Sequence, residues 1–238
     1  MKADLHIHSC LSPCGDWEMS PLAIAARGIE EGLDMMALSD HNAVGNLPAF
    51  FCACEAAGIV PVGGIEVTSE EEAHVLCLFP DLEKATEFGS WIHDHLPDIP
   101  NDPEQFGDQV AVDENEEVLY EEPKLLISAV SLNLDEILAK THAMGGLYIP
   151  AHVDKPRFSL TSQLGFIPKM DYDALEVADF KARLLVKKAV KIGNSDAHYL
   201  SDVGKRFTVY ETEEASFEAL RDCLHRGALL PGSRPYRF

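Results

Sequence analysis

Short apolar segments alternate with helical patterns along most of this sequence, and the alternation limits the folds that the chain can adopt. Six or seven short strands interleaved with helices predict a parallel sheet that carries its helices on the outside. A chain of 238 residues is long enough for such a sheet to close like a barrel. We therefore expect an α/β fold with a barrel-like sheet.

Local signals indicate where the individual elements begin and end. Ser20-Pro21 is typical of a helix start, because serine caps the first turn and proline fits its first position. Gly58 and Gly145-Gly146 are typical of helix ends. The expected helices span residues 20–31, 47–58, 81–95, 134–144 and 216–227. The expected strands span residues 4–8, 35–38, 59–62, 74–79, 147–151, 174–177, 190–193 and 207–211.

The alternation is interrupted at residues 97–122, a segment rich in acidic residues with prolines near its start. Within it, the letters DENE join QVAV to EVLY, which predicts a β-hairpin. No linker or repeat divides the rest of the chain. We therefore expect a single domain of residues 1–238 that carries a small insertion around 97–122.

The charge balance is strongly acidic. Forty acidic against 19 basic residues give a net charge of −21. Such a surface repels polyanions, so we expect no long nucleic acid as a partner. A small phosphorylated substrate remains our expectation, provided that cations in the pocket offset its charge.

The sequence also carries information on compartment. No apolar run is long enough to cross a bilayer, and the segment MKADLHIHS lacks the basic and apolar parts of a secretory signal. We expect a cytoplasmic protein with no membrane partner. The six cysteines do not form a dense disulfide framework, so we interpret them as reduced thiols. Nothing in the sequence indicates an oligomeric state.

Histidine or acidic residues stand at or beside an end of nearly every expected strand. His6 and His8 close the first strand, and because alternate residues share a face, their imidazoles can bind one divalent ion. Such residues recur later in the chain as Asp40, His41, Glu66, His74, His152, Asp196 and His198. These groups would be costly to bury together without an ion to coordinate. Nitrogen and carboxylate ligands favour Zn, Mn or Fe, so the pattern predicts a multinuclear metal site.

These residues fall in five motifs, DLHIHS, SDHN, GIEVT, AHVD and NSDAH, between residues 4 and 198. In this order the motifs resemble the polymerase and histidinol phosphatase (PHP) superfamily of metal-dependent phosphoesterases. The resemblance implies a distorted (β/α)7 TIM-like barrel and a centre of two to three divalent ions. It also implies that the chain is an enzyme that hydrolyses a phosphate ester.

The resemblance further implies a role for each residue by its position. A first ion would be bound by His6, His8, Glu66 and Asp196. A second ion would be bound by Glu66, which bridges the two, and by His74 and His152. A third ion would be bound by His41, His198 and a residue of the loop after the first motif.

That loop departs from the usual spacing of the family. It contains both Cys14 and Asp16. We expect Asp16 to complete the third site, because a carboxylate matches the other ligands. Cys14 lies nearer the typical offset and stays open as the alternative.

The implied chemistry is attack on phosphorus by a metal-activated hydroxide, with cations stabilising the leaving group. Glu66 and Asp196 would hold the ions, and Asp40 would orient a ligand or assist proton transfer, with orientation preferred. Lys155 and Arg157 follow a predicted ligand closely and are scarce basic residues in an acidic chain. An ordinary surface loop explains them equally well, but basic residues in the same loop of related small members slightly favour a phosphate clamp.

The expected substrate is a small phosphomonoester, a nucleotide bisphosphate or an oligonucleotide end. One alternative is an amidohydrolase acting on an amide or lactone, since such enzymes also place His-x-His at the end of a first barrel strand. The SDH and NSDAH segments do not fit that scheme. A second alternative is a non-catalytic metal-binding PHP module, but nearly all ligand positions are filled.

Overall fold

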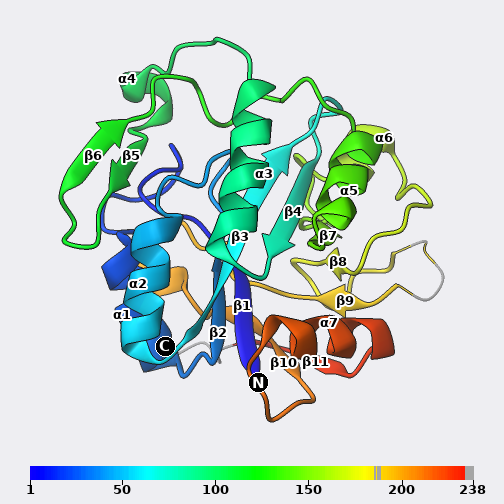
Figure 1. Ribbon diagram of the computed structural model, residues 1–238. Coiled ribbons are helices and arrows are strands. Elements are labelled where there is room, and N and C mark those ends of the chain that lie inside the picture. The colour runs from blue at the N-terminus through cyan, green and yellow to red at the C-terminus, as the bar shows by residue number, and fades with distance from the viewer. Residues whose placement is uncertain (185, 187–188, 234–238) are drawn as a thin grey trace.

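The computed structural model describes residues 1–184, 186 and 189–233, and Figure 1 shows how their helices and strands are arranged. The helices are α1 (Pro21–Glu31), α2 (Leu47–Ala57), α3 (Leu82–Asp94), α4 (Pro103–Phe106), α5 (Leu134–Ala143), α6 (Leu160–Leu164), the 3-10 turn η1 (Leu200–Asp202) and α7 (Phe217–Arg226). The strands are β1 (Lys2–Ile7), β2 (Met35–Leu38), β3 (Val60–Thr68), β4 (His74–Phe79), β5 (Val110–Val112), β6 (Val118–Glu121), β7 (Leu147–Pro150), β8 (Leu175–Glu176), β9 (Lys191–Ile192), β10 (Arg206–Tyr210) and β11 (Leu229–Ser233).

The main sheet is curled and contains seven strands in the order β11-β10-β1-β2-β3-β4-β7. The parallel pair β8–β9 lies between the two limbs of this half-barrel. On the β7 side, the backbone N–H of Val153 donates to the carbonyl of Glu176 at 2.9 Å, and on the β1 side that of Asp196 donates to the carbonyl of His6 at 2.9 Å. These bonds close a distorted barrel of the predicted (β/α)7 type, and the expected fold class is confirmed.

The expectation of a wholly parallel sheet is wrong at β4. Strands β1, β2 and β3 are parallel to one another, but β4 is antiparallel to both β3 and β7. Only residues 69–73 separate β3 from β4, which is too short for the crossover that a parallel pair needs. The resulting register pairs Thr68 with His74 and Glu66 with Leu76, so two predicted ligands lie on neighbouring strands.

Strand β3 is longer than the sequence predicts. It continues through Gly63 and Gly64 as far as Thr68, so Glu66 lies within a strand and not beyond its end. The glycines allow close packing: a Cβ at Gly63 would lie 2.5 Å from the Cβ of Ala85 on α3. Gly63 therefore allows α3 to pack closely on the sheet, and it does not end the strand.

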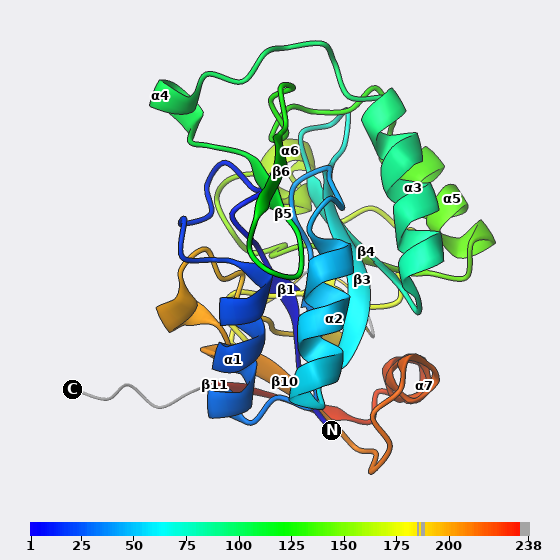
Figure 2. The same ribbon diagram turned by 60° about the vertical axis from the view of Figure 1, so that its left-hand side comes forward.

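Both faces of the sheet are buried, which explains why its strands read as continuous apolar runs. On β4, Val75 and Phe79 belong to a core cluster that includes Phe88 of α3, with the rings of Phe79 and Phe88 4.8 Å apart. Leu76 and Leu78 belong to a second cluster that includes residues of α7. Figure 2 shows α1, α2, α3 and α5 around the outside of the sheet, with α7 near the N-terminal end of β1.

The predicted helix ends are confirmed at several positions. The Ser20 hydroxyl accepts a hydrogen bond from the backbone of Ala23 at the start of α1, and Pro21 follows it. Gly58 ends α2 in the left-handed conformation with a φ of 71°. Gly227 ends α7 in the same way, with a φ of 64°.

The segment 97–122 contains α4 and the antiparallel hairpin β5–β6, as the DENE turn predicts. The hairpin contacts the loop after β1, because Val110 N–H donates to the carbonyl of Cys10 at 3.0 Å. Asn46, which precedes α2, donates to the carbonyl of Val110 and accepts from the backbone of Val112. The segment therefore supports the loop that carries the predicted third-site ligand.

Among the described residues, no helix is both long enough and apolar enough to cross a membrane.

A methyl group at Gly64 has no room, and Gly64→Ala is expected to destabilise the protein. Its Cβ would lie 2.4 Å from Ser39 Oγ and 2.6 Å from the carbonyl oxygen of Leu38. A backbone oxygen cannot move aside easily, so we expect the free energy of unfolding to fall by about 1–3 kcal/mol or more. Gly165→Ala is the control, because it adds a Cβ with no neighbour within 4 Å and only its φ of 79° is unfavourable. Denaturant unfolding compares the two variants, and a smaller loss for Gly64→Ala would contradict the packing argument.

Candidate metal centre

The predicted ligands gather in one buried cluster at the end of the barrel where β1 and β2 finish. The cluster unites side chains that are far apart in sequence and come from β1, β3, β4 and the loops after β2, β7 and β9. Its members are His6, His8, His41, Glu66, His74, His152, Asp196 and His198. Asp16, the remaining predicted ligand, lies outside it.

Glu66 lies at the centre of the cluster and is 1% exposed. Its two carboxylate oxygens face five imidazoles on several sides. The closest contacts are 3.3 Å to His6 Nε2, 3.4 Å to His8 Nε2, 3.1 Å to His41 Nδ1, 3.0 Å to His74 Nδ1 and 3.1 Å to His152 Nε2. A single carboxylate with ligands on both sides has the geometry of a bridging group.

The hydrogen bonds of His6 and His8 direct lone pairs toward a common point. His6 Nδ1 donates to Glu176 at 3.1 Å, and His8 Nδ1 donates to Ser12 Oγ at 3.0 Å, because that hydroxyl itself donates to Asp40. Their Nε2 atoms then carry lone pairs, and these atoms face each other at 3.1 Å. Both also lie 3.5 Å from Asp196 Oδ1. Lone pairs and a carboxylate oxygen that converge in this way fit a bound cation.

The structure contains three groups whose ligand atoms lie within 4.8 Å of one another. The groups are His6, His8 and Asp196; His41, Glu66 and His74; and His8, Cys14, His41 and His198. Shared His8 and His41 make the groups contiguous. Two imidazole nitrogens of the cluster also lack hydrogen-bond partners in the described part of the chain: His152 Nδ1 and His41 Nδ1, which contacts Glu66 without hydrogen-bond alignment. These donor sets fit the divalent ions that the sequence predicts.

The charges of the cluster favour metal ligation. Burial by itself would raise the pKa of Glu66 and of Asp196, but the surrounding imidazoles, His6 among them, hold both pKa values well below the usual range. Burial by itself would lower the pKa of His6, yet the neighbouring carboxylates hold it well above the ordinary value. Burial and repulsion from His8 lower the pKa of His198 to about 4. The carboxylates thus stay ionised, and the protons that they favour on His6 and His8 are the ones that a cation would replace.

Backbone strain concentrates at this site. Residues other than glycine rarely adopt positive φ, yet four such residues lie in or beside the cluster. They are Asn42 (47°), His152 (28°), Phe158 (53°) and Asp196 (54°). Strain of this kind is retained where a side chain must be aimed, which agrees with a functional site.

The loop after β1 brings Cys14, and not Asp16, to the cluster. Cys14 shares a group with His8, His41 and His198, whereas the Asp16 carboxylate accepts a hydrogen bond from the backbone of Glu18 and belongs to no group among the described residues. Asp16 as the third-site ligand therefore stays a prediction, and the arrangement of the loop favours the alternative, Cys14. The physical reason is a tight turn that the motif spacing does not reveal, in which Gly15 N–H donates to the carbonyl of Ser12 at 2.8 Å.

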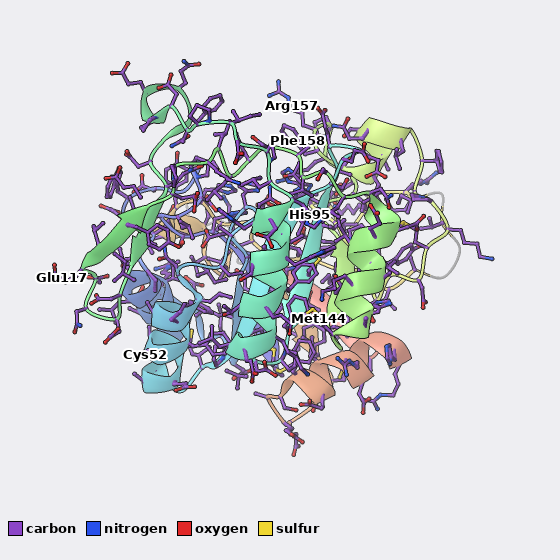
Figure 3. The ribbon with its side chains drawn as sticks, turned by 45° about the horizontal axis from the view of Figure 1, so that its top comes forward. Cys52, His95, Glu117, Met144, Arg157 and Phe158 are labelled. Atoms are coloured by element: carbon purple, nitrogen blue, oxygen red, sulfur yellow. The ribbon has the colours of Figure 1, made fainter. Side chains whose placement is uncertain are left out.

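The other predicted site residues surround the cluster. Asp40 is buried and accepts hydrogen bonds from Ser9 and Ser12, so it acts on His8 only through Ser12. The Lys155 ammonium pairs with the Asp196 carboxylate at the cluster. Figure 3 shows Arg157 beside Phe158, with its side chain directed outward, and Arg157 is exposed.

Glu176 is a site residue that the sequence reasoning missed. It is 2% exposed on β8, where it binds His6 Nδ1, and it also accepts hydrogen bonds from the backbone of His152 and the side chain of Asn194, both at 2.8 Å. It therefore positions elements from three parts of the barrel. The signal was present in the strand ALEV, because a carboxylate in a strand buried on both faces requires a partner.

Replacing Glu176 by glutamine is expected to weaken metal binding while the fold is retained. The neutral amide removes the charged acceptor that fixes the ring of His6, and loss of such a partner lowers metal affinity about 10- to 100-fold. Metal affinity is measured by competition with a chelator, and folding by melting temperature. Glu121→Gln on the exposed face of β6 is the matched control. Equal affinity in the two variants would contradict a positioning role for Glu176.

Solved structures share this fold. The lesion-specific endonuclease PfuEndoQ from Pyrococcus furiosus gives a TM-score of 0.64 at 20% identity, covering 97% of this chain and 57% of that chain. An endonuclease Q complex with a 27-mer duplex that has an abasic lesion at the active site gives 0.65 at 21% identity, covering 94% and 56%. A protein from Bifidobacterium adolescentis described as a metal-dependent phosphoesterase gives 0.57 at 17% identity, covering 94% and 96%. This chain thus spans little more than half the length of endonuclease Q.

The expectation that excluded long nucleic acid as a partner is wrong. An endonuclease Q of this fold forms a complex with a 27-mer duplex substrate, so the fold does not prevent such binding. The physical reason for the error is that a net charge of −21 sums the whole surface. Binding depends on the local field at the site, which the net charge does not describe.

Family models match the chain over most of its length. A model of the PHP domain matches residues 4–193, and a model of the PHP-associated region matches residues 188–229. A comparison with curated proteins gives no match. The five motifs, the distorted barrel and the clustered ligands agree with the family match, and the resemblance seen in the sequence is confirmed. The chain therefore belongs to the PHP domain family and is a metal-dependent hydrolase.

Proposed function

We propose that this protein hydrolyses a phosphate ester at a centre of two to three divalent ions around Glu66. The observation that carries the proposal is the position of Glu66, whose Oε1 contacts His6, His74 and His152 and whose Oε2 contacts His8 and His41. A carboxylate between two sets of ligands supports two ions close together. Such a pair suits a phosphate ester, because two cations can stabilise both the attacking and the leaving oxygen.

The proposed ligand sets follow the contacts in the cluster. The first ion would be held by His6, His8, Asp196 and Glu66. The second would be held by Glu66, His74 and His152, and the third by His41, His198 and a residue of the loop after β1. Zn, Mn and Fe all suit nitrogen and carboxylate ligands of this kind.

Metal ions bound in this way would activate a water molecule and polarise the phosphate oxygens. The residues of the chain hold and orient the reacting groups. Lys155 pairs with Asp196, and when that carboxylate binds a cation the ammonium can turn to a phosphate oxygen. Asp40 fixes His8 through the Ser12 hydroxyl and is proposed to have an orienting role.

With Mn, Zn or Fe added, the protein is expected to hydrolyse a simple aryl phosphate. Glu66→Gln should lower kcat/KM by about 100- to 1000-fold, because the proposed bridging charge is lost. Glu121→Gln, an exposed substitution on β6, should leave the rate unchanged. Release of phosphate is measured together with the melting temperature, which separates loss of turnover from loss of fold.

The same assay distinguishes the alternatives. Turnover of an amide or lactone without phosphate release would contradict the proposal and favour an amidohydrolase. A wild-type protein that binds metal and stays inactive on all substrates, while Glu66→Gln only lowers stability, would indicate a non-catalytic module. Nucleotide bisphosphates, oligonucleotide ends and a duplex with an abasic site then define the substrate class.

Lys155→Ala is expected to weaken substrate binding more than Arg157→Ala does. A charge-assisted hydrogen bond to phosphate contributes about 1.5–3 kcal/mol, so kcat/KM should fall about 10- to 100-fold, mostly through KM. Arg157 carries the same charge in the same loop but is exposed, which makes it the matched control. Steady-state kinetics on the aryl phosphate measure both variants. Equal losses of kcat/KM in the two variants would contradict a specific contact between Lys155 and the substrate phosphate.

A further inference from the structure

The third ligand group differs from the other two in its chemistry. Its atoms come from three imidazoles and one thiol, those of His8, His41, His198 and Cys14, and all of them lie within 4.8 Å of one another. The other two groups combine histidine with a carboxylate. Sulfur and nitrogen donors without a carboxylate form a softer site.

The position of Cys14 is fixed by the loop around it. Ser12 N–H donates to the carbonyl of Ser9 at 3.1 Å, and Asp16 N–H donates to the carbonyl of His198 at 2.9 Å. A Cβ at Gly15 would lie 2.2 Å from the carbonyl oxygen of Ser9, so the turn is packed tightly on itself. The bond between Asp16 and His198 ties the thiol-bearing turn to a second member of the group.

The insertion adds a second support. Gly107 packs so closely on the turn that a Cβ there would lie 2.1 Å from the carbonyl oxygen of Pro13, the residue before Cys14. The indole N–H of Trp17 donates to the carboxylate of Asp108 at 2.9 Å. A loop held from both sides in this way presents the thiol at a defined place.

The cysteines that have other partners contrast with Cys14. Cys10 donates to the carbonyl of Val110, and Cys77 accepts from the hydroxyl of Thr141. Both of these thiols are buried, whereas Cys14 and Cys52 are exposed. Cys52 lies on α2, well away from Arg157 and Phe158 in Figure 3. It provides an internal reference for an exposed thiol that belongs to no ligand group of the described chain.

We propose that Cys14 is the thiolate ligand of the third metal ion, which it binds together with His41 and His198, while His8 Nε2 serves the adjacent first ion. The thiol proton passes to solvent as the sulfur–metal bond forms. A thiolate selects Zn, Co or Fe over Mn, so this centre combines a soft third site with two sites that contain carboxylates. This inference rests on the proposed metal centre and assigns one of its ligands.

A cavity beside the turn makes the assignment testable. It measures about 260 Å³, and Cys14, Asp16, Trp17, Asp108 and Tyr199 are among the residues that line it. Because Cys14 is exposed and lines this cavity, we expect a small alkylating reagent to reach its sulfur when no metal is bound. A sulfur–metal bond would protect the thiol, whereas Cys52 would react at the same rate with or without metal.

The experiment loads the full chain with Co(II), whose bond to thiolate gives a charge-transfer band in the near ultraviolet. Wild type and Cys52→Ser are expected to show the band. Cys14→Ser should lose both the band and one cobalt ion per chain. Cys14→Asp should retain the ion and lose the band, which separates loss of sulfur from loss of the site. Iodoacetamide labelling, followed by mass spectrometry of the peptides, should show that cobalt protects Cys14 and not Cys52.

A cobalt-loaded wild type without the band, or a Cys14→Ser protein that keeps it, would overturn the assignment. Equal labelling of Cys14 with and without cobalt would overturn it as well. These readouts do not depend on turnover. A wild type with the band but without phosphate release would refute the proposed function and leave the ligand assignment standing.

Discussion

The site depends on the burial of one carboxylate, that of Glu66, among imidazoles from four parts of the barrel. An isolated buried carboxylate costs several kcal/mol, so it is stable only when positive groups surround it. The sheet topology provides them. The antiparallel return of β4 brings His74 to the strand next to that of Glu66, and the parallel strand β1, which lies beyond β2, brings His6 and, just after its end, His8. A wholly parallel sheet would have needed a long crossover where the chain has a short turn.

The hydrogen bonds of His6 Nδ1 and His8 Nδ1 determine which nitrogens of the two rings can bind an ion. Glu176 takes the proton of His6 Nδ1, and the Ser12–Asp40 pair takes that of His8 Nδ1. In the neutral rings the lone pairs therefore lie on the Nε2 atoms, which face Asp196. Because these partners are themselves buried and fixed by backbone groups, the ring orientations exist before any ion binds.

Much of the fold and most of the cluster could be predicted from local sequence. The period of two in a strand places His6 and His8 on one face, and caps such as Ser20 and Gly58 define helix ends without tertiary information. The direction of β4 and the full length of β3 could not be predicted in this way. They depend on where neighbouring elements pack so closely that only glycine fits, as at Gly63 and Gly64. Such close packing exists only in the folded chain.

The omission of Glu176, the preference for Asp16 over Cys14 and the wrong inference from overall charge have a related cause. A motif contains the ligands but not the residues that hydrogen-bond to them, so Glu176 was missed. Asp16 was preferred because a carboxylate matches the other ligands, although the turn brings Cys14 to the cluster. Net charge likewise does not say where on the surface the charges lie. At physiological ionic strength charges are screened beyond about 8 Å, so acidic residues on distant helices contribute little at the cluster. Cations that neutralise Glu66 and Asp196, with Lys155 beside them, would dominate the field that an approaching phosphate meets.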